Sequence, residues 1–461
     1  MTFVGPPPRP ATTRPDRLVG GPLLLRLTLF IVMTAPAYMV LEAVGASGSL
    51  QQLLALVLLG LWVASAIFGR FRHRDFRHPG RVALMIWITV SFLSYAAMMA
   101  GLSGSSTVAE RAAADRWLLL LLAGVGLTLS ITQSLLTRED VRRAVGWLMA
   151  GASVCGVVAV VQFTTQSNPM EMLQPLLIGF ENNGSGTPSQ PRGAFLRVAG
   201  TTMHPIELGV VCSMLLPLSI WWGLYSTSPK IWKRWAPSVL MLAGCAFTVS
   251  RSAMLGLAVT AAVMIPHLPK AARRWAIIVA PAVLVSLFVA VPGMMTTLFG
   301  AATAGTDDPS IAARTDDYPL AWKVLVEQPI LGHGPGTWMP DNAMDIFDNE
   351  YLMAAVTQGA LGVGALLMYL LVPAMASLLA AKHAPDPELR LLGGSVAAAM
   401  FVAFVSSATF DSMSFMTFAL LVPVFIGLAG TTWLLVTKQP DTHSSADLAL
   451  EPRINTPTPR G

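Results

Sequence analysis

The chain has 461 residues, of which 54% are hydrophobic and only 12% are charged. A soluble domain usually carries about 25% charged residues, so this composition excludes a soluble enzyme. It also excludes a disordered or nucleic-acid-binding chain, which needs dense charge. The length accommodates about 12 membrane spans of about 20 residues each, together with their loops, and we therefore predict an all-α polytopic membrane protein.

Two polar tails flank the apolar part of the chain. Residues 1–20 are rich in Pro and Arg, and residues 437–461 are polar as well, so both predict disordered cytoplasmic tails. Between them, residues 21–436 predict one transmembrane domain. Its first apolar segment, at about 22–44, is too long for a signal-peptide core and predicts a retained first helix. The further apolar runs lie at 50–69, 82–101, 117–136, 144–163, 205–226, 236–250, 252–268, 275–293, 351–373, 390–410 and 413–436.

The basic residues are distributed very unevenly over the two sides of these predicted spans. Of the 30 Lys and Arg residues, 23 fall on the side that holds both termini. Cytoplasmic loops carry the excess of Lys and Arg in membrane proteins, so both termini are predicted to be cytoplasmic and the number of spans to be even.

The opposite side carries two long polar connections, at about 164–204 and 294–350. The second lies between predicted helices 9 and 10 and has a helical pattern at 317–328. Long connections of this kind are usually functional or disordered. Any chemistry is therefore expected on the outer face.

Two of the few outer arginines, Arg197 and Arg314, lie in these connections, and a third, Arg251, lies between the apolar runs 236–250 and 252–268 at the membrane boundary. Arginine is always charged, and its planar fork matches the oxygens of a phosphate group. One reading is that the three converge to bind an anion. The other is that each pairs with a carboxylate, such as Glu207 or Asp317, and fastens a loop.

A glycine-rich stretch, GHGPG at residues 332–336, follows the helical pattern of the second connection. Such a loop can present backbone N–H groups to a phosphate, but it lacks the P-loop pattern, and a plain tight turn is the preferred interpretation. His333 lies in this stretch and His204 precedes Pro205 at a helix start; each is either structural or part of the site. No metal-ligand spacing accompanies them, so no metal is predicted.

The segment FDNEYL places Asp348 directly before a long apolar helix, followed by Asn349 and Tyr351. An aspartate at this position can cap the helix by accepting its free N–H groups. Alternatively, it acts as a general base at the helix entrance.

In their order, four segments resemble the O-antigen ligase and O-antigen polymerase family of bacterial membrane glycosyltransferases. The resemblance covers about residues 195–375. The matching segments are RVAGTTMHPIELG (Arg197, His204), TVSRSAMLGL (Arg251), Arg314 with Trp322 ahead of PILGHGPG, and DNEYLMAAVTQGALG (Asn349, Tyr351).

The resemblance implies a transferase that polymerises or ligates a polyprenyl-diphosphate-linked glycan at the outer face of the bacterial cytoplasmic membrane. It implies that Arg197, Arg251 and Arg314 bind the diphosphate, with His204, His333, Asn349 and Tyr351 as further contacts. The ligases usually have a His-Asn pair where this chain has Asp348-Asn349. Asp348 replaces the histidine as base, or His333 takes that role, or the acceptor differs.

The expected reaction is inverting and needs neither metal nor cofactor, because the diphosphate already activates the donor. The expected partners are the lipid-linked donor, a glycan or lipid-glycan acceptor, membrane lipid and envelope-assembly proteins. A transporter or flippase of a lipid-linked or anionic substrate is the alternative. It predicts flux without a change in glycan length.

Overall fold

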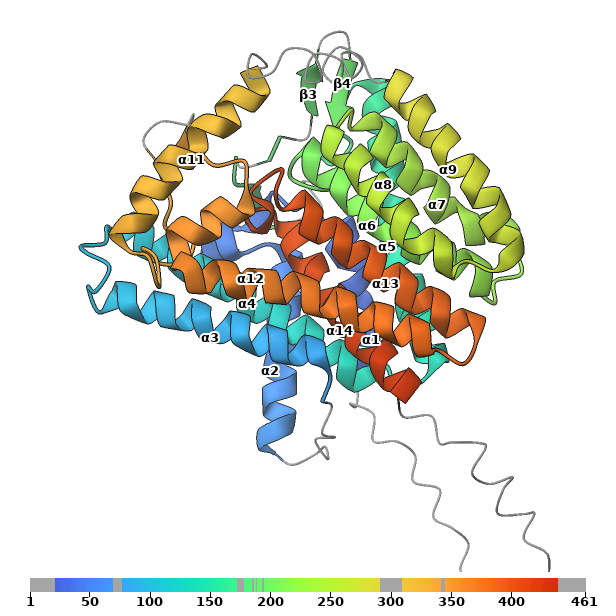
Figure 1. Cartoon of the computed structure of the whole chain (residues 1–461), viewed down its shortest axis with the longest axis horizontal. Coiled ribbons are helices and arrows are strands. Elements are labelled where there is room, and N and C mark those ends of the chain that lie inside the picture. Colours follow the sequence, from blue (N-terminus) through green and yellow to red (C-terminus); the bar gives the residue numbers. More distant parts are fainter. Residues whose placement is uncertain are drawn as a thin grey trace, which may run out of the picture.

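The computed structural model describes residues 21–68, 77–171, 178–184, 186–187, 189–192, 195–290, 309–340 and 345–437. These residues form a helical bundle (Figure 1). The predicted tails at 1–20 and 438–461 lie outside the described residues. The helices are α1 (Gly21–Thr34), α2 (Leu50–Ile67), α3 (Pro79–Met99), α4 (Val108–Ser134), α5 (Arg138–Thr165), α6 (Pro205–Tyr225), α7 (Ile231–Phe247), α8 (Arg251–Met264), α9 (Lys270–Ala290), α11 (Pro309–Glu327), α12 (Glu350–His383), α13 (Pro387–Ser406) and α14 (Met416–Thr437).

Each predicted apolar run falls on one of these helices, which confirms an all-α polytopic membrane protein. Among the described residues, eight helices are long and apolar enough to cross a membrane: α2, α3, α4, α5, α6, α12, α13 and α14. The runs assigned to α1, α7, α8 and α9 complete the predicted set, so the number of twelve spans stays a prediction.

The bounds of several helices differ from the predicted runs, and two of these differences have a local reason. α1 ends at Thr34 because the next residues, Ala35 and Pro36, disfavour helical backbone. α4 begins at Val108, well before its apolar run. Its N-terminus is fixed by a capping box in which Thr107 and Glu110 satisfy each other's backbone amides.

Short strands and turns occupy the predicted outer connections. Strand β1 (Met39–Leu41) pairs antiparallel with β2 (Phe180–Asn182), and β3 (Ser189–Arg192) pairs antiparallel with β4 (Phe195–Val198). Short 3₁₀ helices cover Glu42–Ser47, Ile265–His267 and Ser412–Ser414. Figure 1 shows α11 lying outside the main bundle. This helix, Pro309–Glu327, covers most of the helical pattern predicted at 317–328.

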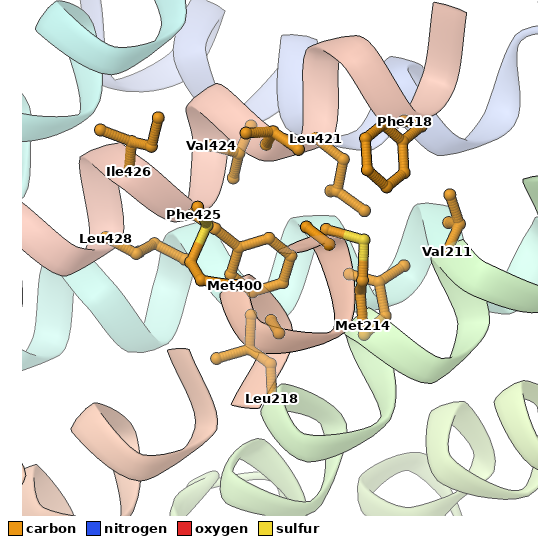
Figure 2. Close-up of a cluster of buried hydrophobic side chains, with 14 of the residues drawn as sticks. Val211, Met214, Leu218, Met400, Phe418, Leu421, Val424, Phe425, Ile426 and Leu428 are labelled. Carbon is orange, nitrogen blue, oxygen red and sulfur yellow. The ribbon is translucent and has the colours of Figure 1, made fainter. Parts of the chain in front are cut away.

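The centre of the bundle is built from α6, α13 and α14. Figure 2 shows Met214 and Leu218 of α6 and Met400 of α13 pointing toward Leu421 and Phe425 of α14, and all five are buried. Close approach is possible because α13 is rich in small residues, as is usual where helices pack inside a membrane. The result is a rigid framework that fixes the helix ends described next.

Candidate functional site

Four helix ends meet at the predicted outer end of the bundle, around the loop between α13 and α14 (residues 407–415, here called the α13–α14 loop). The amide of Glu350, at the start of α12, donates to Ser407 O at 2.8 Å. The hydroxyls of Ser252, at the start of α8, and Thr409 lie 3.0 Å apart. Segments far apart in the sequence thus converge on one loop.

Arg197 lies on β4 and is held beside the turn between α7 and α8. Its side chain is 8% exposed. Its Nε donates to Thr248 O at 2.8 Å, and its Nη1 donates to Gln190 Oε1 at 3.2 Å. Because Thr248 is three residues before Arg251, this bond brings the two predicted arginines to the same turn.

Arg251 is the first residue of α8 and is exposed. The turn before it contains Val249 at a φ of +47°, an outlier for a β-branched residue. A cation at a helix N-terminus opposes the helix dipole. The position of Arg251 is therefore not explained by helix stability, whereas an anion would be favoured there by both the guanidinium and the helix end.

His204 caps α6: its Nδ1 accepts from the amide of Ile206 at 3.1 Å. Burial, and next to it the charge of Arg197, lower the pKa of His204 to about 4. The imidazole is therefore neutral at pH 7, and the structure favours the structural reading of this residue.

Arg314 lies in α11, but its side chain is outside the part that the structure describes. Its predicted role therefore stays a prediction. α11 packs against α12, so its helix is at least attached to the element that follows Asp348 and Asn349.

The start of α12 separates the roles of three predicted site residues. Asn349, not Asp348, caps the helix, because its Oδ1 accepts from Tyr351 N at 2.9 Å. The capping role considered for Asp348 is therefore wrong, and the Asp348 side chain is exposed. The hydroxyl of Tyr351 donates to Phe404 O at 2.7 Å, which anchors α12 to α13.

Two buried glutamates, whose roles differ from the solvated or arginine-paired acids expected from the sequence, hold the α13–α14 loop in place. The carboxylate of Glu350, 6% exposed, accepts from Met413 N at 2.8 Å. The fully buried carboxylate of Glu207 accepts from Met203 N at 2.7 Å and from Phe418 N at 3.0 Å. Glu207 is thus bonded to backbone amides, contrary to the idea that it fastens an arginine.

Asp411, in the middle of the α13–α14 loop, was not predicted from the sequence. Burial, and in smaller part the charge of Asp348, raise its pKa to about 6. Two carboxyl groups therefore influence each other close to the helix starts that carry the arginines. The only sequence signal was one acid in the short polar gap between the last two apolar runs.

The backbone of His333 and of the glycine-rich stretch packs against helix α12. Helix α12 is interrupted at Gly359, and the segment 329–334 fills the break. The amides of His333 and Gly334 donate to carbonyl oxygens of α12, at 3.2 and 2.8 Å. These two amides are therefore not available to a phosphate, and the phosphate-cradle reading is wrong for them.

The His333 side chain faces another element: its Nε2 lies 3.4 Å from Val324 O of α11. The contacts described for this side chain do not include the α13–α14 loop. The structure thus brings Arg197, Arg251, His204, Asp348, Asn349 and Tyr351 to one end of the bundle and places His333 in the packing between α11 and α12.

Potential metal ligands are dispersed over the described part of the chain. No three His, Cys, Asp or Glu side chains in the described ranges are grouped so that they could hold a metal ion. The three cysteines, Cys155, Cys212 and Cys245, are buried and unpaired with one another.

Comparison with known families gives one finding. Residues 236–367 match a family model described as O-antigen ligase. This confirms the resemblance over a segment from α7 into α12, which contains Arg251, Arg314, Asp348, Asn349 and Tyr351, and it implies a glycosyl-transferring membrane enzyme. Arg197 and His204 precede the matched segment. No match was found among curated proteins.

Proposed function

We propose that the chain transfers a glycan from a polyprenyl-diphosphate donor to an acceptor hydroxyl at the outer face of the cytoplasmic membrane. The observation that carries this proposal is the meeting of two arginines and two carboxyl groups around the α13–α14 loop. Such a transfer needs cations that hold the diphosphate and a base that receives the proton of the acceptor hydroxyl.

In this proposal the arginines act on the leaving group. Arg251 binds the donor diphosphate at the start of α8, and Arg197 supports it from the neighbouring turn. Negative charge increases on the diphosphate as its bond to the sugar breaks, and the guanidinium groups offset that charge. Arg314 is expected to be the third such group.

The carboxyl groups act on the acceptor. Asp348 is exposed and orients or deprotonates the acceptor hydroxyl, with Asp411 as its neighbour. The hydroxyl oxygen attacks the anomeric carbon, its proton passes to the carboxylate, and the electron pair of the breaking C–O bond leaves on the diphosphate. A single displacement of this kind inverts the configuration at the anomeric carbon. No metal or cofactor takes part in it.

The test compares Arg251→Ala with Arg111→Ala in membranes supplied with a polyprenyl-diphosphate-linked glycan and an acceptor. Arg111 is an exposed arginine on the predicted outer side, and its Nε donates to Ser106 Oγ. Loss of a charge-stabilising group costs about 100-fold or more in rate. We expect that loss for Arg251→Ala only, and full activity of this variant at normal expression would refute the proposal.

Two further measurements define the reaction. Asp348→Asn keeps the size of the side chain and removes the base, so near-normal turnover would exclude Asp348 from catalysis. Mass analysis of lipid-linked glycans in a deletion strain separates the activities: retained single repeats without long chains indicate a polymerase, and accumulated full-length lipid-linked chains indicate a ligase.

The alternative of a transporter is favoured by one observation, the broken helix α12. Discontinuous helices of transporters bind substrate at the break. Here the segment 329–334 forms backbone hydrogen bonds with both sides of the break, which leaves those groups satisfied by protein. A transporter would move the lipid-linked glycan between leaflets without changing its length, and a flux assay on vesicles distinguishes the two.

A further inference from the structure

A groove of about 840 Å³ runs along α3 at the opposite end of the bundle from the α13–α14 loop. It is lined by Arg77 and His78, by residues of α3 from Pro79 to Val90, and by Trp433 near the end of α14. Both termini lie on this side in the topology predicted from the basic residues, so the groove is placed at the cytoplasmic leaflet.

The mouth of the groove is positively charged. Arg77 lies just before the cap of α3 and Arg81 lies in its first turn, and within the described residues neither forms an ion pair. Elsewhere on this side, Arg138 pairs with Asp386 at 2.7 Å, and Arg142 pairs with Glu388 at 2.6 Å. Two arginines at one mouth, neither paired with an acid of the described ranges, favour an anionic occupant.

His78 sits between them and contributes no charge. Its Nδ1 accepts from the Arg81 amide at 3.2 Å, and its ring packs where a Cβ at Gly430 of α14 would stand. Burial and the charge of Arg81 lower its pKa to about 4. The mouth thus carries two positive charges around a neutral His78 that is packed against α14.

Below the mouth the groove is apolar and continues for the depth of one leaflet. Val82, Met85, Ile86 and Val90 follow at helical spacing, and Val82 and Met85 are 59% and 53% exposed. At 1.5 Å per residue, the distance from Arg81 to Val90 is about 14 Å. Half of a bilayer's hydrocarbon core is about 15 Å, which matches an acyl chain.

We propose that this groove binds a phospholipid with an anionic headgroup from the cytoplasmic leaflet. The headgroup phosphate contacts Arg77 and Arg81, and an acyl chain lies along α3 against Trp433. Basic pockets between helices on the cytoplasmic side are suited to such headgroups. The site is separate from the proposed donor site, which is at the other end of the bundle.

The lipid would stabilise the helix that holds the break in α12. From another part of α3, Ser91 Oγ donates to Gln358 Oε1 at 2.9 Å, and Ser94 Oγ donates to Leu331 O at 2.7 Å. A lipid that fixes α3 therefore also supports the packing of the segment 329–334 against α12.

The test uses the full-length protein, delipidated in mild detergent and titrated with phosphatidylglycerol, phosphatidylcholine or inorganic phosphate. Bound lipid is counted by native mass spectrometry, and thermal unfolding is measured in parallel. The double variant Arg77→Gln/Arg81→Gln is matched by Lys230→Gln/Lys233→Gln, which removes the same charge from two exposed residues of the same side that do not line the groove.

Each basic side chain near an anionic lipid surface contributes about a fivefold gain in affinity. We expect phosphatidylglycerol to bind the arginine double variant about 25-fold more weakly and the lysine variant as it binds the wild type. Met85→Trp, which fills the groove and keeps both charges, should also lose lipid.

Three results would each overturn the proposal. They are equal binding of phosphatidylcholine and phosphatidylglycerol to the wild type, an equal stabilisation by inorganic phosphate alone, and unchanged lipid binding by Met85→Trp. Because the first two use the wild-type protein, they remain decisive if a variant fails to fold.

Discussion

Gly359 is the residue at which α12 breaks, and we expect Gly359→Ala to destabilise the protein strongly. Its φ of 67° and ψ of −165° belong to a region that is almost restricted to glycine, and another residue there costs about 1–3 kcal/mol. A Cβ at this position would also meet the backbone carbonyl of Ile330. The segment 329–334 would then have to move away.

That movement removes hydrogen bonds as well. Ala360 N donates to Pro329 O at 2.9 Å and Leu361 N donates to Ile330 O at 3.3 Å. Each bond contributes about 0.5–1.5 kcal/mol. Together with the backbone strain, the expected loss in the free energy of unfolding is about 2–6 kcal/mol.

The assay is reversible unfolding in mixed detergent micelles, followed by tryptophan fluorescence. Gly364→Ala is the matched control, because Gly364 lies on the same helix, has no positive φ, and has no atom within 4 Å of the place that an added methyl group would take. Alanine is the better helix former, so the control should be neutral or stabilised by up to about 1 kcal/mol. If Gly359→Ala unfolds within about 1 kcal/mol of the wild type, the strained break does not carry the stability assigned to it.

Three other substitutions test the electrostatics. The raised pKa of Asp411, about 6, means that stability from this group is present below about pH 4 and lost as the pH rises through 6; Asp411→Asn should raise Tm at pH 7.5 and have no effect near pH 4. The pKa of His204 is lowered to about 4, so stability from this group is present above about pH 6.5 and is lost as the pH falls from 6.5 to 4. His204→Asn, which keeps a capping acceptor, should therefore reduce the loss of Tm over this pH range. Glu388→Ala removes two bonds with Arg142, at 2.8 and 2.6 Å, and should cost about 1.5–3 kcal/mol in denaturant unfolding, whereas Glu139→Ala, at an exposed pair, should cost less than about 1 kcal/mol.

The arginines illustrate how far the sequence reaches into the site. Arg197 and Arg251 stood out because few basic residues remain outside once the topological ones are assigned. Their separation in the chain gives no sign that a single bond, from Arg197 Nε to Thr248 O, joins their turns. The sequence identified the residue types, and the fold supplied their proximity.

The acids illustrate the opposite case. Glu207, Glu350 and Asp411 lie at helix starts or in a short gap, where a solvated charge is the ordinary expectation. Their roles depend on backbone amides of α14 and its preceding turn, as in the bond from Phe418 N to Glu207. No local pattern encodes a partner more than 200 residues away.

What the sequence alone determined is the helical membrane class, the position of most helices and the division of charge between two sides. These follow from runs of apolar residues and from the count of Lys and Arg, which are local properties of the chain. Only the tertiary structure decided that backbone amides of GHGPG bond to α12 beside its break and that Asn349 rather than Asp348 caps α12. It also decided that the charge of Asp348 raises the pKa of Asp411. Each of these depends on hydrogen bonds or charges between segments that meet only when the helices pack.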